Sequence, residues 1–364
     1  MHFVCGKCGK KAATDTRSPR CDCGGLWSLE FEPPKFSMDK IDLDRWGIFR
    51  YRKFMALESE VWRDVTMGEG ETPVIRLDNQ VLLKMEYCMP TLSFKDRGAA
   101  VLISHCKAIG VDSVVQDSSG NAGGSIAAYA ARAGIRCEIF VPEGTPPKKI
   151  AMIEAYGAKC TVVPGGRDRC AEVCREKAVR EGVYYASHVF NPFFYEGTKT
   201  YIYEILEQMG HIPEHLLFPV GNGTLFLGAM RALEHLLDSG AIPAMPQVIA
   251  VQSEGCDPLL RAAQAGKDQP EPVTPTPTMA EGIAIGQPLR GEEILAYAKK
   301  HGVHFVHAPE DQILSARAQL ARRGVYCEHT TAASYAAFLR YCKEYGPVRE
   351  CLIPMCGAGL KSDH

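Results

Sequence analysis

One lysine in the chain has the surroundings that nucleophilic amine chemistry requires. Lys95 lies in residues 90–98, PTLSFKDRG, after an apolar run that predicts a strand and before a segment with helical spacing. Ser93 followed by Asp96 is typical of a helix start, so we expect Lys95 in the first helical turn. The helix dipole disfavours a charged ammonium there, and a neutral amine is the nucleophile of Schiff-base chemistry. The alternative is a solvated charge run, Lys-Asp-Arg, at a helix end.

Four cysteines near the N-terminus have the spacing of a metal site. Cys5 and Cys8 form a Cys-x-x-Cys motif. After twelve intervening residues, Cys21 and Cys23 form a Cys-x-Cys motif. Four thiolates satisfy a tetrahedral structural zinc ion and leave no position for a catalytic water. We therefore expect a zinc-ribbon-like segment over residues 1–32, with four ordinary thiols on a polar arm as the alternative.

Three glycine-containing turns follow apolar runs. The turn SSGNAGG at residues 118–124 precedes an alanine-rich helical pattern, and backbone N–H groups at such a helix start bind a carboxylate or phosphate. The turn GNGTL at residues 221–225 lets the backbone approach a phosphate, and it matches neither the dinucleotide nor the Walker motif. The turn CGAGLK at residues 356–361 places a small neutral thiol at its tip. Each could be an ordinary turn, but with a nucleophilic lysine they make the set that pyridoxal phosphate needs.

The elements that must position these residues alternate between strands and helices. From about residue 72 onward, apolar runs are followed by a glycine turn and a helical pattern, which indicates parallel sheets covered by helices on both faces. We expect two open, twisted, mostly parallel sheets in an α/β fold with the N-terminal arm. The expected domains are a large one from residues 33–95 and 196–364 and a small one from residues 96–195, after the segment 1–32.

Composition bounds the function class. The chain has 364 residues, 46% of them hydrophobic and 23% charged, as in soluble globular proteins. A formal net charge of −2 gives no field for binding nucleic acid, and no apolar run is long enough to span a membrane. The N-terminus lacks the apolar region of a secretory signal, and many of the 15 cysteines lie singly in apolar segments. We expect a cytoplasmic protein.

The ordered set of motifs resembles a known family. The segments PTLSFKDRG, SSGNAGGSIAAYAARAG, VPEGTPPKKIAMIEAYGAK, PVGNGTLFLGA, AEGIAIGQPLR and CGAGLK, with the cysteine-rich N-terminus, resemble threonine synthases. These are pyridoxal-phosphate enzymes of the tryptophan synthase β fold, fold type II. The resemblance covers nearly the whole chain and implies a small amino-acid substrate and a homodimer.

The resemblance also implies roles for individual residues. Lys95 is expected to form the internal aldimine, Asn121 to contact the 3-hydroxyl of the cofactor, and Cys356 to face its pyridine nitrogen. A neutral thiol there makes the ring a weaker electron sink than a carboxylate would, which favours chemistry at the β or γ carbon. Further cofactor contacts are expected from Phe94, Gly221, Asn222, Gly223, Thr224 and Leu225, and substrate contacts from Thr91, Ser118, Ser119, Gly120 and Ala122.

The chain departs from the family pattern at Leu92, where a glycine is common, and at one turn. Threonine synthases usually read GNTS where residues 120–123 read GNAG, and the missing hydroxyls are expected near the substrate phosphate. Each lost hydrogen bond to a charged group removes about 1–3 kcal/mol. Two enzymatic interpretations therefore stay open. One is a lyase that converts O-phospho-L-homoserine and water to L-threonine and phosphate. The other is a β-elimination or β-replacement enzyme on serine, threonine, phosphoserine or a related amino acid, like dehydratases or cysteate synthase. A cofactor-binding protein without catalysis is the non-enzymatic alternative.

Overall fold

The chain divides into two compact units. A computed structural model describes residues 1–362. Among the described residues, the first unit contains Met1–Gly70 and Lys95–Thr198, and the second contains Glu71–Phe94 and residues 199–362. Among the helices of residues 1–362, none is both long and apolar enough to cross a membrane.

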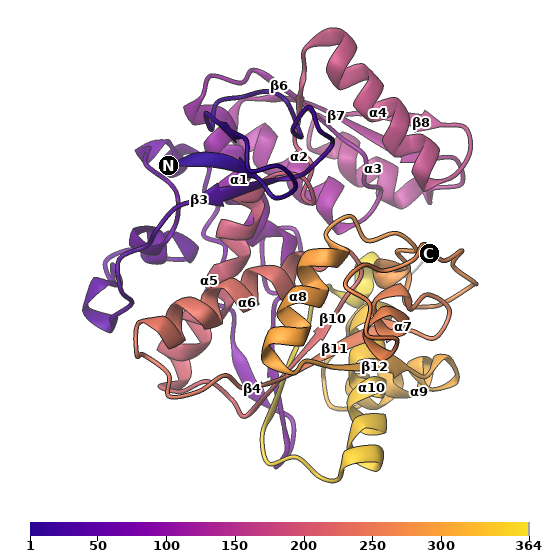
Figure 1. Ribbon diagram of the computed structural model, residues 1–364. Helices are drawn as coiled ribbons and strands as arrows, with labels where there is room; N and C mark the ends of the chain where they lie inside the picture. The colour runs from indigo at the N-terminus through magenta and orange to yellow at the C-terminus, as the bar shows by residue number, and fades with distance from the viewer. Residues whose placement is uncertain (363–364) are drawn as a thin grey trace. The chain divides into compact units, whose positions relative to one another are not determined.

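The first unit is built on a four-stranded parallel sheet with the order β8-β7-β6-β9. Its strands are short and apolar at their centres, and each of the first three is followed by a helix, as the alternating pattern predicts. Figure 1 labels three of these strands, β6, β7 and β8, and the four helices in the purple to magenta part of the ribbon. The strands are β6 (Ser113–Gln116), β7 (Arg136–Pro142), β8 (Lys159–Val163) and β9 (Tyr184–Tyr185), and the helices are α1 (Lys95–Ala108), α2 (Asn121–Ala133), α3 (Pro147–Ala155) and α4 (Arg167–Glu181).

The N-terminal arm of the first unit contains a small antiparallel sheet with the order β2-β1-β3. Residues 33–70, which follow this sheet, contain three short 3₁₀ helices separated by irregular segments. The bounds are β1 (His2–Cys5), β2 (Lys11–Ala12), β3 (Trp27–Glu30), η1 (Met38–Lys40), η2 (Ile48–Phe54) and η3 (Glu60–Asp64). Residues 33–70, expected in the large domain, group instead with the first unit. Buried hydrogen bonds explain this grouping, because Tyr129 donates to Glu69 and the Ala56 N–H donates to Glu196.

The second unit is built on a six-stranded sheet with the order β12-β11-β10-β13-β5-β4. Five strands are parallel, and the edge strand β4 runs antiparallel to β5. The strands are β4 (Val74–Arg76), β5 (Val81–Lys84), β10 (His215–Pro219), β11 (Gln247–Ser253), β12 (His304–Ala308) and β13 (Cys351–Pro354). Their buried faces form one apolar core with helices α9 and α10, which lie beside the strands in Figure 1.

Helices α5 to α10 and three short 3₁₀ helices complete the chain. The long helix α5 begins in the first unit and ends in the second. The bounds are α5 (Pro192–Met209), α6 (Thr224–Asp238), α7 (Pro258–Gln264), η4 (Glu281–Ile283), α8 (Gly291–His301), η5 (Glu310–Gln312), α9 (Ile313–Ala321), α10 (His329–Tyr345) and η6 (Gly359–Lys361).

Candidate active site

Lys95 is the first residue of α1, in the first helical turn as its sequence context predicts. Its Nζ atom lies 5.8 Å from the centre of the Phe194 ring. The next residue, Asp96, is fully buried and accepts a hydrogen bond of 2.5 Å from Ser125 in α2. A Cβ atom on Gly98 would lie 2.4 Å from the Phe194 ring, so α1 packs closely on the start of α5. The lysine is therefore held on a helix start that two other helices fix.

The turn that follows β6 leads into the start of α2. Gln116, the last residue of β6, accepts a hydrogen bond of 2.9 Å from the Ser118 N–H through Oε1. The Ser118 hydroxyl accepts one of 3.3 Å from the Gly120 N–H, and α2 begins at Asn121. A Cβ atom on Gly123 would lie 1.8 Å from the Ser118 carbonyl oxygen. This turn has no room for a hydroxyl-bearing side chain at position 123.

In the second unit, three of the predicted segments meet at one edge of the sheet. The adjacent parallel strands β5, β13 and β10 lead at their carboxyl ends into residues 91–94, Cys356 and residues 221–225, respectively. The Phe94 N–H donates to the Cys356 carbonyl oxygen at 3.1 Å, and Ser93 bridges to Gly357. The carboxyl ends of parallel strands are where ligands bind in open α/β sheets.

The turn after β10 needs its glycines. A Cβ atom on Gly221 would lie 2.9 Å from Ile285 and 3.1 Å from the backbone of Ile283. Gly223 has φ of 71°, a left-handed conformation, and α6 begins at the next residue, Thr224. The side chains of Ile285 and Ile294 pack against these glycines, and the first N–H groups of α6 follow directly. A glycine turn that leads into a helix start is a form in which backbone N–H groups bind phosphate.

The predicted residues fall in both units. Lys95, Ser118, Ser119, Gly120, Asn121 and Ala122 lie in the first unit. Thr91, Phe94, Gly221, Asn222, Gly223, Thr224, Leu225 and Cys356 lie in the second. Phe94 and Lys95 are consecutive in the chain. Three further residues near Lys95 and the turn at residues 118–124 were not predicted from the sequence: Gln116, His188 and Phe194. A polar residue closing the apolar run of β6 is the only sequence signal for Gln116, and we find none for the other two.

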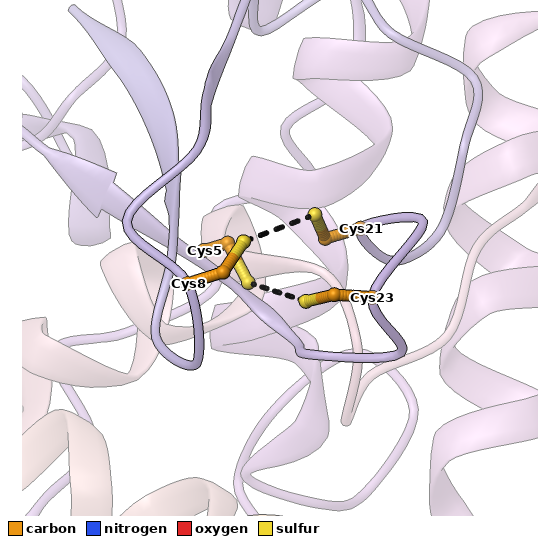
Figure 2. Close-up of side chains that lie close together, drawn as sticks. All are labelled: Cys5, Cys8, Cys21 and Cys23. Carbon is orange, nitrogen blue, oxygen red and sulfur yellow. Dashed lines mark hydrogen bonds between the residues drawn. The ribbon is translucent and has the colours of Figure 1, made fainter.

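The four N-terminal cysteines are clustered in the first unit, as Figure 2 shows. Their Sγ atoms all lie within 4.8 Å of one another, with Cys5 and Cys23 at 3.5 Å and Cys8 and Cys21 at 3.7 Å. A tetrahedron with Zn–S bonds of about 2.3 Å has sulfur atoms about 3.8 Å apart. The spacing of the sulfur atoms is that of a four-thiolate metal site.

The family match and the similar sequences both point to pyridoxal-phosphate enzymes. Residues 65–357 match the family described as pyridoxal-phosphate dependent enzyme. The chain is 30% identical over 355 residues to the threonine synthase of Methanocaldococcus jannaschii, which covers 93% of this chain and 87% of that protein. It is 33% identical over 288 residues to the threonine synthase of Mycobacterium tuberculosis, covering 77% of this chain and 78% of that one.

Solved structures share the fold. Threonine deaminase isoform 2 from Solanum lycopersicum superposes with a TM-score of 0.72 at 23% identity, covering 90% of this chain and 86% of that one. A pyridoxal 5'-phosphate-dependent aspartate racemase superposes with a TM-score of 0.68 at 25% identity, covering 79% and 90%, respectively. The expected α/β fold of type II is confirmed. The chain belongs to the pyridoxal-phosphate dependent enzymes, and within them to the threonine synthase family.

Proposed function

We propose that the protein is a threonine synthase-like lyase that converts O-phospho-L-homoserine and water to L-threonine and phosphate. The observation that carries this function is the similarity to threonine synthases over 93% of the chain, which includes the lysine at the start of α1. Bound pyridoxal phosphate would supply an electron sink for bonds at the α, β and γ carbons of an amino acid.

Each predicted residue has a role that its surroundings support. Lys95 is the residue that would bind the cofactor, and its amine is the base that would move protons between substrate carbons. The turn at residues 221–225 fits a phosphate, because its glycines lead directly into the first N–H groups of α6. The turn at residues 118–122 would bind the substrate carboxylate through its N–H groups. The buried Cys356 thiol is a neutral partner for a ring nitrogen.

The test of this function is a panel of amino acids with the purified holoenzyme. Phosphate release with threonine formed from O-phospho-L-homoserine supports the proposal, and it should be lost in Lys95→Ala together with the visible absorbance of the bound cofactor. Lys107→Ala, on the last turn of α1, is the matched control. Wild-type turnover by Lys95→Ala would contradict the proposed role of this lysine.

One structural observation favours a second function. The Gly123 Cβ position lies against the Ser118 carbonyl oxygen, so the GNAG turn is not a GNTS turn with two side chains truncated. A turn without these hydroxyls suits an unphosphorylated substrate better than a phosphate dianion. The second candidate is β-elimination or β-replacement on serine, threonine, phosphoserine or a related amino acid. Formation of ammonia and a keto acid, or of a new product with added sulfide or sulfite, identifies it.

We also propose that Cys5, Cys8, Cys21 and Cys23 bind a structural zinc ion in a zinc-ribbon-like arm. The spacing of their sulfur atoms and the short antiparallel strands β1 to β3 support this site. Metal analysis of the purified protein should give one zinc ion per chain, lost in Cys8→Ser. The exposed Cys88 lies outside the cluster, so Cys88→Ser should keep the metal. An equal metal content in both variants would contradict the site.

The homodimer and the cytoplasmic location expected from the sequence stay predictions, as do the domain roles. Light scattering of the holoenzyme tests the dimer directly. A mass of one chain at micromolar concentration would contradict it.

A further inference from the structure

Gln116 connects two segments at one edge of the first unit's sheet. It is fully buried at the end of β6, and β9, the parallel neighbour of β6, leads into His188 three residues after its end. Gln116 Oε1 accepts from the Ser118 N–H at 2.9 Å, and Nε2 lies 3.1 Å from His188 Nδ1. A backbone N–H only donates, so the amide oxygen must face Ser118 and the amide NH₂ must face the histidine.

This orientation determines the tautomer of His188. Because the Gln116 NH₂ donates to Nδ1, the neutral imidazole carries its proton on Nε2. Burial and then the positive charge of Lys95 lower the pKa of His188 well below its usual 6.5, so the ring stays neutral at physiological pH. Nε2 makes no hydrogen bond to any residue within 1–362, and His188 is half-buried. His188 therefore offers a fixed neutral N–H donor.

The histidine and the lysine both lie near the Phe194 ring. The His188 and Phe194 rings meet edge to face with centres 5.8 Å apart, and Lys95 Nζ lies 5.8 Å from the centre of the same Phe194 ring. Through Gln116, the same histidine is tied to Ser118, the first residue of the anion-binding turn. The turn has backbone N–H groups of its own for a substrate carboxylate, so Nε2 is left for another oxygen atom.

We propose that His188 donates a hydrogen bond from Nε2 to an oxygen atom on the side chain of the amino-acid substrate, and that Gln116 is the positioning residue that holds this donor in register with the carboxylate-binding turn. This proposal rests on one part of the proposed function, namely that the substrate is an amino acid. The substrate class that it implies is an amino acid with a hydroxyl or ester oxygen at its β or γ carbon.

The test uses substitutions that separate the two nitrogen atoms of His188. An asparagine can place Oδ1 near the position of Nδ1 and accept from Gln116, but it has no atom at the position of Nε2. A glutamine can place an NH₂ near the position of Nε2. Binding of L-homoserine and of L-2-aminobutyrate, which lacks the side-chain oxygen, is followed in the holoenzyme by the change in cofactor absorbance.

The wild type should bind L-homoserine more tightly than L-2-aminobutyrate by about tenfold or more, the value of one hydrogen bond. His188→Asn should lose this preference, with affinity for L-2-aminobutyrate and for the cofactor unchanged. His188→Gln should recover most of it. A merely structural role would weaken both ligands alike. Equal weakening of both ligands in His188→Asn would overturn the proposal. So would a wild-type preference for L-homoserine in His188→Asn, or a wild type that binds both ligands equally.

The tautomer has a separate check that does not depend on turnover. In the ¹⁵N spectrum of histidine-labelled holoenzyme, His188 should show a protonated Nε2 and an unprotonated Nδ1. Gln116→Glu keeps the acceptor for Ser118 but removes the donor to Nδ1, so the proton should move to Nδ1 and the preference for L-homoserine should fall. A protonated Nδ1 in the wild type would overturn the proposal. If phosphohomoserine is not turned over but these binding results hold, only the proposed function fails.

Discussion

Leu92 is a residue whose backbone conformation is costly. Its φ is 60°, in the left-handed region, and its neighbours hold it there because its N–H donates to Met89 and its carbonyl accepts from Ala358. The side chain is 40% exposed, so truncation removes little burial. A non-glycine residue in this region costs about 1–2 kcal/mol.

We predict that Leu92→Gly is more stable than Leu92→Ala by about 1 kcal/mol, because both remove the side chain and only glycine relieves the backbone. Chemical denaturation of the two variants with saturating cofactor measures the difference. Equal stability, or a more stable alanine variant, would contradict the backbone argument.

Glu69 is a buried acid that makes stability depend on pH. Burial raises its pKa to about 7, despite donors from the Met67 backbone, Tyr129 and Thr66. Between its ordinary pKa of 4.5 and this value, the folded chain holds one proton more than the unfolded chain. Its contribution to the free energy of unfolding is therefore present at low pH and is lost as pH rises through this window, by on the order of 3 kcal/mol.

Glu69→Gln should remove this dependence. The difference in unfolding free energy between wild type and Glu69→Gln should shift by on the order of 3 kcal/mol between about pH 4.5 and about pH 8, with the wild type relatively weaker at the higher pH. Urea titrations at both pH values measure it, with Glu32→Gln on the surface as the matched control. If the difference in unfolding free energy is the same at both pH values, the raised pKa of Glu69 is contradicted.

At the scale of elements, β5 and α5 are joined by a buried ion pair. Lys84 and Glu204 are both fully buried, and Lys84 also donates to the Thr72 carbonyl at 2.5 Å and to Gln208 at 3.0 Å. Glu204 accepts from the Thr72 N–H at 2.8 Å. Removing one partner of such a pair leaves an uncompensated charge, which costs about 3–5 kcal/mol.

Lys84→Met should therefore be strongly destabilised, and Lys84→Met combined with Glu204→Gln should recover part of the loss. The glutamine keeps an acceptor for Thr72 and removes the orphaned charge. Lys300→Met, on an exposed pair with Glu234, is the control and should cost less than about 1 kcal/mol. If the double variant is no more stable than Lys84→Met alone, the unpaired charge of Glu204 is not the cause of the stability loss.

The elements were largely predictable, and the contacts between them were not. Alternating apolar runs and glycine turns are local, so β6 with α2 and β10 with α6 follow from spacing. The antiparallel edge strand β4 and the grouping of residues 33–70 with the first unit depend on pairings far apart in the chain. The hydrogen bond from Gln116 to His188 spans 72 residues, so no local pattern could reveal it.

At the scale of the whole molecule, the cysteine cluster is linked to the helix that carries Lys95. Phe3 of β1 meets Phe193 of α5 edge to face at 5.9 Å, and Phe193 stacks on His105 of α1 at 3.7 Å. Burial lowers the pKa of His105 to about 4, so its neutral ring donates from Nε2 to the Thr14 carbonyl at 3.0 Å. The arm therefore covers the later turns of α1 with its own backbone and rings.

Metal loss should thus reach beyond the arm. Zinc binding in so small a segment supplies on the order of 10 kcal/mol of its folding energy. We predict that a chelator, or Cys8→Ser, increases amide hydrogen exchange in residues 1–30 and also in α1 around His105, while β10 to β13 exchange as before. Cys88→Ser treated with the same chelator in parallel should match the chelated wild type. Because Thr14 contacts His105 of α1 and Phe3 contacts Phe193 of α5, faster exchange confined to residues 1–30 would mean that the arm does not support the lysine helix.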